Sequence, residues 1–259
     1  MDFGINGKKV LITGGSKGIG RAIAKAFAAE GSEVILVARK ASDLKNVVDE
    51  IGGKKQGHSF FSANLLEKDA PIRTAKELLE KHRNFDIVVH NVGGALGIKD
   101  PIGPMIDWEK VWRFNVGISI DMNSLLVPSM RRNGWGRIIH ISSVSAMLGE
   151  LRLNPYGGSI PYAASKSYLN AYVRGLGREL ADQNIVVSAI MPGAIISEGK
   201  YWDILSRENP KLVKQYLEEH HSVGRFGKAE EIAPFVVMMA SEQASFACGS
   251  ILPIDGGRI

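Results

Sequence analysis

The stretch Val10-Leu11-Ile12-Thr13-Gly14-Gly15-Ser16-Lys17-Gly18-Ile19-Gly20 places a short apolar run directly before a glycine-rich turn. The apolar run is typical of a buried strand, and the pattern over residues 18–30 predicts an amphipathic helix after the turn. Glycines let such a turn fold tightly and approach a ligand closely, and the helix N-terminus offers N–H donors to phosphate. The stretch therefore predicts a strand–turn–helix unit that binds the pyrophosphate of a dinucleotide.

The glycines of this turn are spaced G-x3-G-x-G, which differs from the G-x-G-x-x-G form. No Lys-Ser or Lys-Thr pair ends the turn, so it is not a Walker loop. We expect the turn to contact the cofactor through Gly14, Ser16, Lys17, Gly18, Ile19 and Gly20.

The rest of the chain repeats the alternation of short β-branched runs with longer amphipathic segments. Strands are predicted at 10–12, 34–37, 59–61, 87–89, 137–141, 185–190 and 251–254, and helices at about 18–30, 41–51, 67–82, 107–133, 161–182 and 229–241. Continuous apolar strands separated by helices indicate a parallel sheet that is covered on both faces. The predicted fold class is α/β, a single-domain Rossmann fold over residues 1–259 with a doubly wound parallel sheet of about seven strands.

The composition is that of an ordinary soluble globular protein. The chain has 259 residues, 45% hydrophobic and 23% charged, with a formal net charge of +5. The basic residues are scattered among acidic ones, so nucleic-acid binding is not expected. No long apolar run or signal-peptide pattern occurs, and Cys248 is the only cysteine, so we expect a cytoplasmic protein with no membrane span, disulfide or metal centre.

Tyr162 and Lys166 are four residues apart in a predicted helix, so they share one face. A free tyrosine has a pKa of about 10, and a nearby positive charge lowers that pKa. A proton donor of this kind suits the reduction of a carbonyl to an alcohol. The pair on its own is also compatible with an ordinary helix face.

The end of the second predicted strand reads Val37-Ala38-Arg39-Lys40 and lacks the carboxylate that holds the ribose of NAD. Arg39 is suited instead to a 2′-phosphate, and Lys17 would add a second cation. The expected cofactor is NADP(H) rather than NAD(H).

These motifs, taken in order, resemble the short-chain dehydrogenase/reductase family over nearly the whole chain, including its 3-oxoacyl-[acyl-carrier-protein] reductase-like members. The matching segments are Thr13–Gly20, His90-Asn91-Val92-Gly93, Asn115, Ser142-Ser143, Tyr162–Lys166, Pro192-Gly193 and Asp255-Gly256-Gly257.

The resemblance implies four catalytic residues. Tyr162 would be the proton donor, and Lys166 would lower its pKa and bind the nicotinamide ribose. Ser143, with Ser142 as the runner-up, would hydrogen-bond the substrate oxygen, and Asn115 would hold a water that relays protons. Two hydroxyl donors aimed at one oxygen would stabilise the charge that develops there.

The resemblance also implies further contacts with the cofactor. They come from Asn64, Leu65, Asn91, Gly93, Tyr162, Lys166, Pro192, Gly193, Ile195 and Ser197. The chain departs from the family pattern at Asn64, where an aspartate is usual, at His90 and Val92, and at Ser197, where a threonine is usual.

Two segments are expected to shape the substrate site. Residues 150–158 are an insertion between the catalytic serine and tyrosine, and residues 197–227 interrupt the alternation with aromatic and charged residues. We interpret the second segment as a lid over the substrate, at the side of the sheet where doubly wound folds bind ligands. The insertion is also compatible with a plain surface loop, and residues 197–227 with a surface pair of helices without function.

The predicted function is NADPH-dependent, reversible reduction of a ketone to a secondary alcohol, acting on CH–OH groups. A small polar ketone such as a sugar or polyol ketone is the first expectation. A 3-oxoacyl-[acyl-carrier-protein] reductase is the alternative, with an acyl carrier as partner at basic residues Arg131, Arg132, Arg174 and Arg178. A non-catalytic NADP(H)-binding regulator is a third hypothesis. The resemblance further implies a homotetramer.

Overall fold

The computed structural model describes residues 2–148, 158–197, 199 and 201–258. Its sheet is built from the strands β1 (Lys9–Thr13), β2 (Glu33–Ala38), β3 (Ser59–Ser62), β4 (Ile87–His90), β5 (Gly136–Ile141), β6 (Ile185–Pro192) and β9 (Ile251–Ile254). All seven are parallel, in the order β3-β2-β1-β4-β5-β6-β9. The order reverses between β1 and β4, which creates the crevice where such sheets bind ligands.

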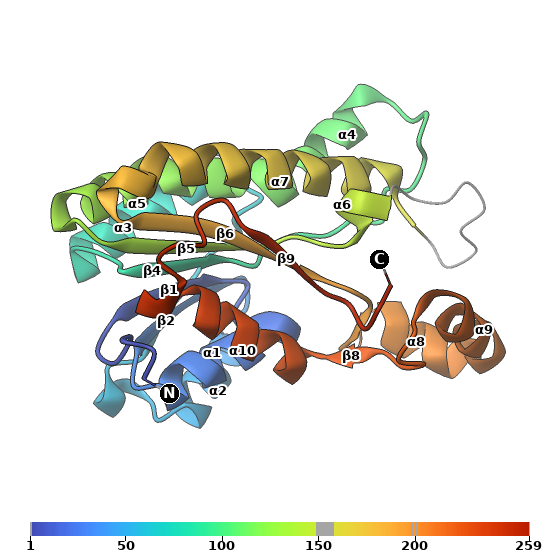
Figure 1. Ribbon diagram of the computed structural model, residues 1–259, viewed down its shortest axis with the longest axis horizontal. Coiled ribbons are helices and arrows are strands. Elements are labelled where there is room, and N and C mark those ends of the chain that lie inside the picture. Colours follow the sequence, from blue (N-terminus) through green and yellow to red (C-terminus); the bar gives the residue numbers. More distant parts are fainter. Residues whose placement is uncertain (1, 149–157, 198, 200, 259) are drawn as a thin grey trace.

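Helices cover both faces of this sheet (Figure 1). One face carries α1 (Gly18–Ala29), α2 (Ala41–Glu50) and α10 (Ala229–Met239), and the other carries α3 (Ala70–His82), α5 (Ile118–Asn133) and α7 (Ile160–Leu180). The predicted doubly wound α/β fold is confirmed. The strand predicted at 251–254 lies at the sheet edge, the place where its proline costs no ladder hydrogen bond.

The strands separate two apolar cores because successive side chains point to opposite faces. In β1, Val10 and Ile12 pack with α1 and α10, whereas Leu11 packs with α3 and α5. Both faces are buried, which explains why the strands read as continuous apolar runs rather than as alternating patterns.

The helix predicted over 107–133 is divided in the structure. It consists of α4 (Met105–Trp112), a π-helical turn (Arg113–Gly117) and then α5. Hydrophobic periodicity does not separate a π-turn from the α-helices on either side, so the sequence pattern merged them. The helix predicted from residue 67 begins later, at Ala70, because Asp69 before it adopts a left-handed conformation with φ of 58°.

The segment after β6 forms a small unit of its own. It contains α8 (Tyr201–Glu208) and α9 (Pro210–His220), and its ends pair as the two-stranded ribbon β7 (Ile195–Ile196) and β8 (Gly227–Lys228). The predicted insertion at 150–158 lies almost wholly outside the described residues. A short helix, α6 (Ser145–Leu148), precedes it, and 3-10 turns occur at Lys54–Gln56, Ala181–Gln183 and Glu242–Ala244.

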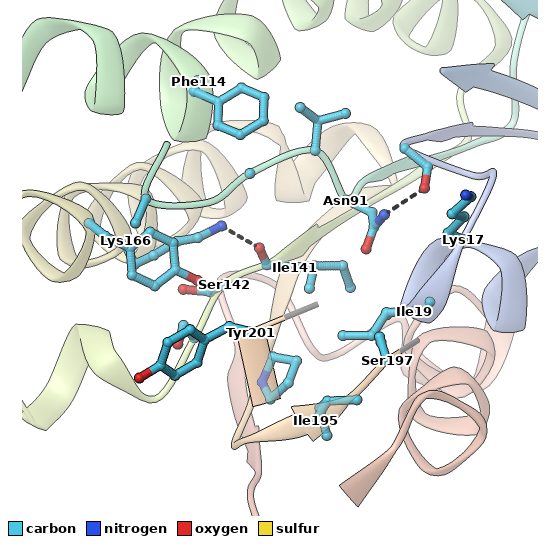
Figure 2. Close-up of a pocket in the computed structure, with 18 of the residues that line it drawn as sticks. Lys17, Ile19, Asn91, Phe114, Ile141, Ser142, Lys166, Ile195, Ser197 and Tyr201 are labelled. Carbon is cyan, nitrogen blue, oxygen red and sulfur yellow. Dashed lines mark hydrogen bonds between the residues drawn. The ribbon is translucent and has the colours of Figure 1, made fainter. Parts of the chain in front are cut away.

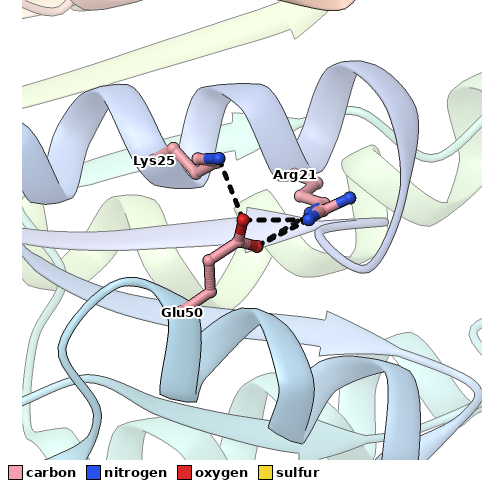
Figure 3. Close-up of polar contacts among 3 residues, drawn as sticks. All are labelled: Arg21, Lys25 and Glu50. Atoms are coloured by element: carbon pink, nitrogen blue, oxygen red, sulfur yellow. Dashed lines mark hydrogen bonds and ion pairs between the residues drawn. The ribbon is translucent and has the colours of Figure 1, made fainter.

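An ion-pair cluster joins α1 to α2 beside the glycine turn (Figure 3). The Glu50 carboxylate accepts hydrogen bonds from Lys25 Nζ at 2.9 Å and from Arg21 Nε and Nη2, also at 2.9 Å. Lys25 and Arg21 hold the pKa of Glu50 below its ordinary value. These side chains are solvent-exposed, so the cluster orients the two helices more than it stabilises the fold.

Within the described residues, no helix is both long enough and apolar enough to cross a membrane.

Candidate active site

A cavity of about 700 Å³ opens at the carboxyl ends of β1, β2, β4, β5 and β6. Its walls include nearly every residue predicted for the site: Gly14, Ser16, Lys17, Gly18, Ile19, Arg39, Asn64, Leu65, Asn91, Gly93, Ser143, Tyr162, Lys166, Pro192, Gly193, Ile195 and Ser197. Gly20 and Asn115 are the exceptions, and each lies directly behind a lining residue, Gly20 behind Gly14 and Asn115 behind Gly93. Residues that are far apart in the sequence therefore meet in one cavity.

The glycine turn is shaped by close backbone contacts. A Cβ atom added to Gly20 would lie 2.2 Å from the Gly14 carbonyl oxygen, so only glycine lets α1 start this close to β1. The Asn91 side chain donates to the same oxygen at 3.1 Å, and Thr13 Oγ1 accepts from the Asn91 backbone N–H at 3.1 Å. The α1 N-terminus is thereby held facing the cavity, as an anion site requires.

The cavity end beside β2 carries the positive charges predicted for NADP(H). Arg39 and Lys40 are exposed there, and neither pairs with a carboxylate in the part of the chain that the structure describes. Lys17 differs, because its ammonium lies 3.3 Å from the Asp43 carboxylate. Asp43 is not among the residues predicted for the site, and it competes with a phosphate for Lys17. Asn64 turns towards its own loop and donates to Glu67 at 3.2 Å.

Tyr162 lies in the first turn of α7. The N-cap residue Ser159 accepts a hydrogen bond from the Tyr162 backbone N–H at 3.2 Å, and its hydroxyl donates to the Ile98 carbonyl at 2.6 Å. This cap fixes where the helix begins and therefore where the phenol is placed. The sequence carried the signal, a serine two residues before Pro161, but the sequence reasoning passed over it.

Lys166 lies one turn further along α7 and is buried. Its ammonium is 5.7 Å from the centre of the Tyr162 ring and donates to the Ile141 carbonyl at 2.7 Å (Figure 2). Burial lowers the pKa of Lys166 to about 7, because a charged ammonium is poorly solvated there. The group can therefore gain or lose a proton near neutral pH.

The two adjacent serines have different environments. Ser142 is buried, and its hydroxyl donates to Asn170 Oδ1 at 2.7 Å. Ser143 Oγ accepts from the Ser145 backbone N–H at 3.2 Å, and no hydrogen bond donated by the Ser143 hydroxyl is found within the described ranges. The Ser143 hydroxyl proton is thus available for a ligand, which favours Ser143 over Ser142.

Asn115 lies in the π-turn between α4 and α5. Its side-chain N–H groups donate to the Gly94 and Val111 carbonyls at 2.9 and 2.8 Å, and its oxygen accepts from the Gly94 N–H at 2.9 Å. A Cβ atom added to Gly93 would lie 2.7 Å from the Asn115 oxygen and 3.0 Å from Lys166 Nζ. Asn115 is therefore close to Lys166 and fixes the loop after β4.

The segment after β6 forms the floor of the cavity. Figure 2 shows Lys166 and Ser142 at one end, Lys17 and Ile19 at the other, and Ile195 and Ser197 below them. Ser197 Oγ comes within 3.0 Å of where a Gly18 Cβ would be, so this segment reaches the glycine turn. The floor thus connects the two ends of the cavity.

The α8–α9 segment adds an aromatic wall. Trp202 stacks on Tyr216 with ring centres 4.3 Å apart, and Tyr201 and Phe226 pack against Trp202 at 5.1 and 5.0 Å. Tyr201, Trp202 and Tyr216 line the cavity together with Arg258, a residue that the sequence reasoning did not single out.

A model of the short chain dehydrogenase family matches residues 8–201. This chain belongs to that family. The match explains why the tyrosine, lysine and glycine motifs occur in one order, and it confirms the expected class of enzyme, an NAD(P)-dependent oxidoreductase acting on CH–OH groups.

The chain is similar over its whole length to family members with different substrates. It is 32% identical to a 3-oxoacyl-[acyl-carrier-protein] reductase of Aquifex aeolicus, over 99% of each chain. The structure superposes on L-sorbose reductase from Gluconobacter frateurii, complexed with NADPH and L-sorbose, with a TM-score of 0.87 and 32% identity, covering 100% of this chain and 98% of the other. A 3-oxoacyl (acyl-carrier-protein) reductase from Agrobacterium tumefaciens with NADP bound gives 0.87 at 27% identity, covering 99% and 96%.

Proposed function

We propose that this protein reduces a small polar ketone to a secondary alcohol with NADPH, and catalyses the reverse reaction with NADP⁺. The observation that carries the proposal is the convergence of Ser143, Tyr162 and Lys166 at one end of a cavity whose other end is cationic. A binding protein without activity would not need a buried lysine beside a tyrosine, since burying that ammonium is costly.

The cavity fits a phosphorylated dinucleotide. The α1 N-terminus faces it, Gly14 and Gly20 leave room for close approach, and Arg39 and Lys40 offer charge where a 2′-phosphate would lie. Similar solved structures contain NADPH or NADP, which supports the same choice here. When bound, the nicotinamide supplies the hydride that reduces the carbonyl carbon.

The remaining chemistry belongs to the chain. Ser143 and Tyr162 direct hydroxyl groups at the carbonyl oxygen, where negative charge develops, and Tyr162 delivers the proton. Lys166 places positive charge beside the phenol. The pKa of Lys166, about 7, lets this side chain pass a proton on near neutral pH. Asn115 orders the loop after β4, and we infer that protons pass between Lys166 and solvent along this loop.

Reduction of a 3-oxoacyl-[acyl-carrier-protein] is a second candidate, and the similar proteins support it equally. The observation that favours it is the exposure of four arginines, Arg131, Arg132, Arg174 and Arg178, in the carboxyl-terminal halves of α5 and α7. A spectrophotometric NADPH-consumption screen over keto sugars, cyclic ketones and β-ketoacyl thioesters separates the two candidates.

A homotetramer remains a proposal that sedimentation measurements can test.

The Tyr162→Phe variant tests the catalytic assignment. We expect it to bind NADPH like the wild type but to lose activity by at least about 100-fold, because the proton donor is gone. Turnover is measured with the best ketone of the screen, and NADPH binding by fluorescence.

Tyr168→Phe is the matched control, because Tyr168 lies on the same helix, half-exposed and packed against Trp112. It should keep near wild-type turnover. Full activity in Tyr162→Phe would refute the assignment of Tyr162 as the acid.

A further inference from the structure

Arg258 is a cavity-lining cation that the proposed chemistry does not use. Its guanidinium carbon lies 5.6 Å from the centre of the Tyr216 ring. Elsewhere in the described chain, arginine ion pairs involve Arg21, Arg113, Arg207 and Arg225, but none involves Arg258. Arginine stays charged at any physiological pH, so a permanent positive charge faces the cavity.

The backbone around Arg258 is held in place rather than trailing into solvent. The Gly256 carbonyl accepts from the Val223 N–H at 3.2 Å, and the Gly257 carbonyl accepts from the Ser222 hydroxyl at 2.9 Å. His221 Nδ1 lies 3.2 Å from the Asp255 carbonyl oxygen. The segment that follows α9 therefore fixes the chain on the amino-terminal side of Arg258.

Neighbouring backbone contacts place this segment at the catalytic end of the cavity. The Val144 N–H, directly after Ser143, donates to the Pro192 carbonyl at 3.2 Å. The Gly193 N–H donates to the Ile254 carbonyl at 3.0 Å. The end of β9 is thus linked through the end of β6 to the catalytic serine.

Charge in the cavity is unevenly distributed. Asp43 is the one carboxylate among the described lining residues, and its partner is Lys17 in the glycine turn. Lys166 and Arg258 also line the cavity, Lys166 beside the Tyr162 ring and Arg258 beside the Tyr216 ring, on which Trp202 stacks. Apolar ring surface beside Arg258 lowers the local dielectric and so strengthens the attraction of this cation for an anion.

We propose that Arg258 determines substrate specificity by binding a carboxylate, so that the preferred substrates are small ketones with a terminal carboxylate. The planar guanidinium matches a carboxylate in a two-pronged hydrogen bond, and its contact with the Tyr216 ring places it at the cavity wall. The aromatic wall would cover the carbon chain between the carboxylate and the ketone. This inference rests on the proposed function and narrows its substrate class.

Matched substrate pairs test the proposal. L-Sorbose and 5-keto-D-gluconate share a carbon skeleton and hydroxyl configuration but end in CH₂OH and carboxylate, and methyl acetoacetate and acetoacetate form a second pair. We expect the wild type to have the higher kcat/KM for the acid of at least one pair. In Arg258→Gln, KM for that acid should rise by about 10- to 100-fold with little change in kcat, and the neutral partner should change less than about twofold.

Two further variants serve as controls. Arg258→Lys keeps the positive charge but loses the two-pronged hydrogen bond of the guanidinium, so it should recover part of the preference for the acid. Arg73→Gln removes an exposed arginine of α3 that is not among the residues lining the cavity, and it should behave as wild type. NADPH affinity and Tm, measured for each variant, check that the proteins are folded.

The outcomes separate this inference from the function on which it rests. The role of Arg258 is overturned if the wild type prefers the neutral member in both pairs. It is also overturned if Arg258→Gln lowers kcat/KM equally for the acid and the neutral ketone. Either result leaves ketone reduction intact. Absence of ketone-dependent NADPH oxidation by the wild type in the whole screen overturns the proposed function itself.

Discussion

At the scale of single residues, Lys166 is subject to two opposing requirements. Its charge is needed beside Tyr162, yet burial of the side chain disfavours the charged form and lowers its pKa to about 7. The Ile141 carbonyl, 2.7 Å away, supplies only a neutral acceptor. An anionic ligand in the cavity would favour the ammonium, so occupancy of the cavity and protonation of Lys166 are coupled.

Arg39 is the residue on which the choice between NADPH and NADH depends. Arg39→Asp replaces the cation by the carboxylate that NAD sites use, so kcat/KM with NADPH should fall by about 10- to 100-fold and that with NADH should rise. Steady-state kinetics with both cofactors measure the change, with Arg39→Lys as the charge-retaining control. An unaltered preference would remove Arg39 from the phosphate site.

At the scale of elements, α7 has to place two catalytic side chains while packing closely on the sheet. Its carboxyl-terminal half passes over the chain that leads into β9. A Cβ atom added to Gly177 would lie 2.4 Å from the Gly249 nitrogen, 2.7 Å from the Gly249 Cα and 3.1 Å from the Val187 oxygen. All three are backbone atoms, which cannot move aside as a flexible side chain can.

We expect Gly177→Ala to destabilise the fold. The added methyl group should lower the free energy of unfolding by about 1–3 kcal/mol and Tm by several degrees, because helix and strand must separate. Thermal and urea denaturation measure the effect.

Gly175→Ala provides the matched control two residues away. Gly175 is exposed on the same helix, and an added Cβ would meet nothing within 4 Å. Alanine there should stabilise the helix by about 0.5–1 kcal/mol. Equal effects of the two substitutions would contradict the close contact between α7 and the chain before β9.

At the scale of the whole molecule, a buried pair of histidines links stability to pH. His90 and His140 lie at paired positions of β4 and β5, and their rings stack with centres 4.8 Å apart. Burial lowers the pKa of His90 to about 4 and that of His140 well below its ordinary value. His90 Nε2 is 2.8 Å from Asn123 Oδ1, but neither ring nitrogen of His140 has a hydrogen-bond partner in the described chain.

This pair predicts loss of stability in mild acid. Between the folded pKa of about 4 and the unfolded value of about 6.5, the unfolded chain binds more protons at His90, so stability falls as the pH falls through this window. At pH 5 the cost from His90 alone is about 2 kcal/mol relative to pH 8. Urea denaturation of wild type and His90→Asn at both pH values measures it. The variant should lose less stability, and parallel losses would contradict the prediction.

The order of strands and helices, the glycine turn and the tyrosine–lysine pair could all be predicted from the amino-acid sequence. These are local signals, because apolar periodicity, turn residues and an i, i+4 spacing each extend over only a few neighbouring residues. The proline in the edge strand at 251–254 and the basic residues at the end of the second strand are local signals of the same kind. The catalytic roles came from the family resemblance, and they remain predictions that the variants above test.

It is the folded chain that shows which side chains share a cavity and what each one contacts. Asp43 opposite Lys17, the commitment of the Ser142 hydroxyl to Asn170, and the position of Arg258 beside Tyr216 all depend on contacts between distant segments. The π-turn at Asn115 also escaped the sequence pattern, because one extra residue in a helical turn leaves the periodicity almost unchanged. Local propensity carries no information on such contacts, which exist only once the sheet brings the ends of its strands together.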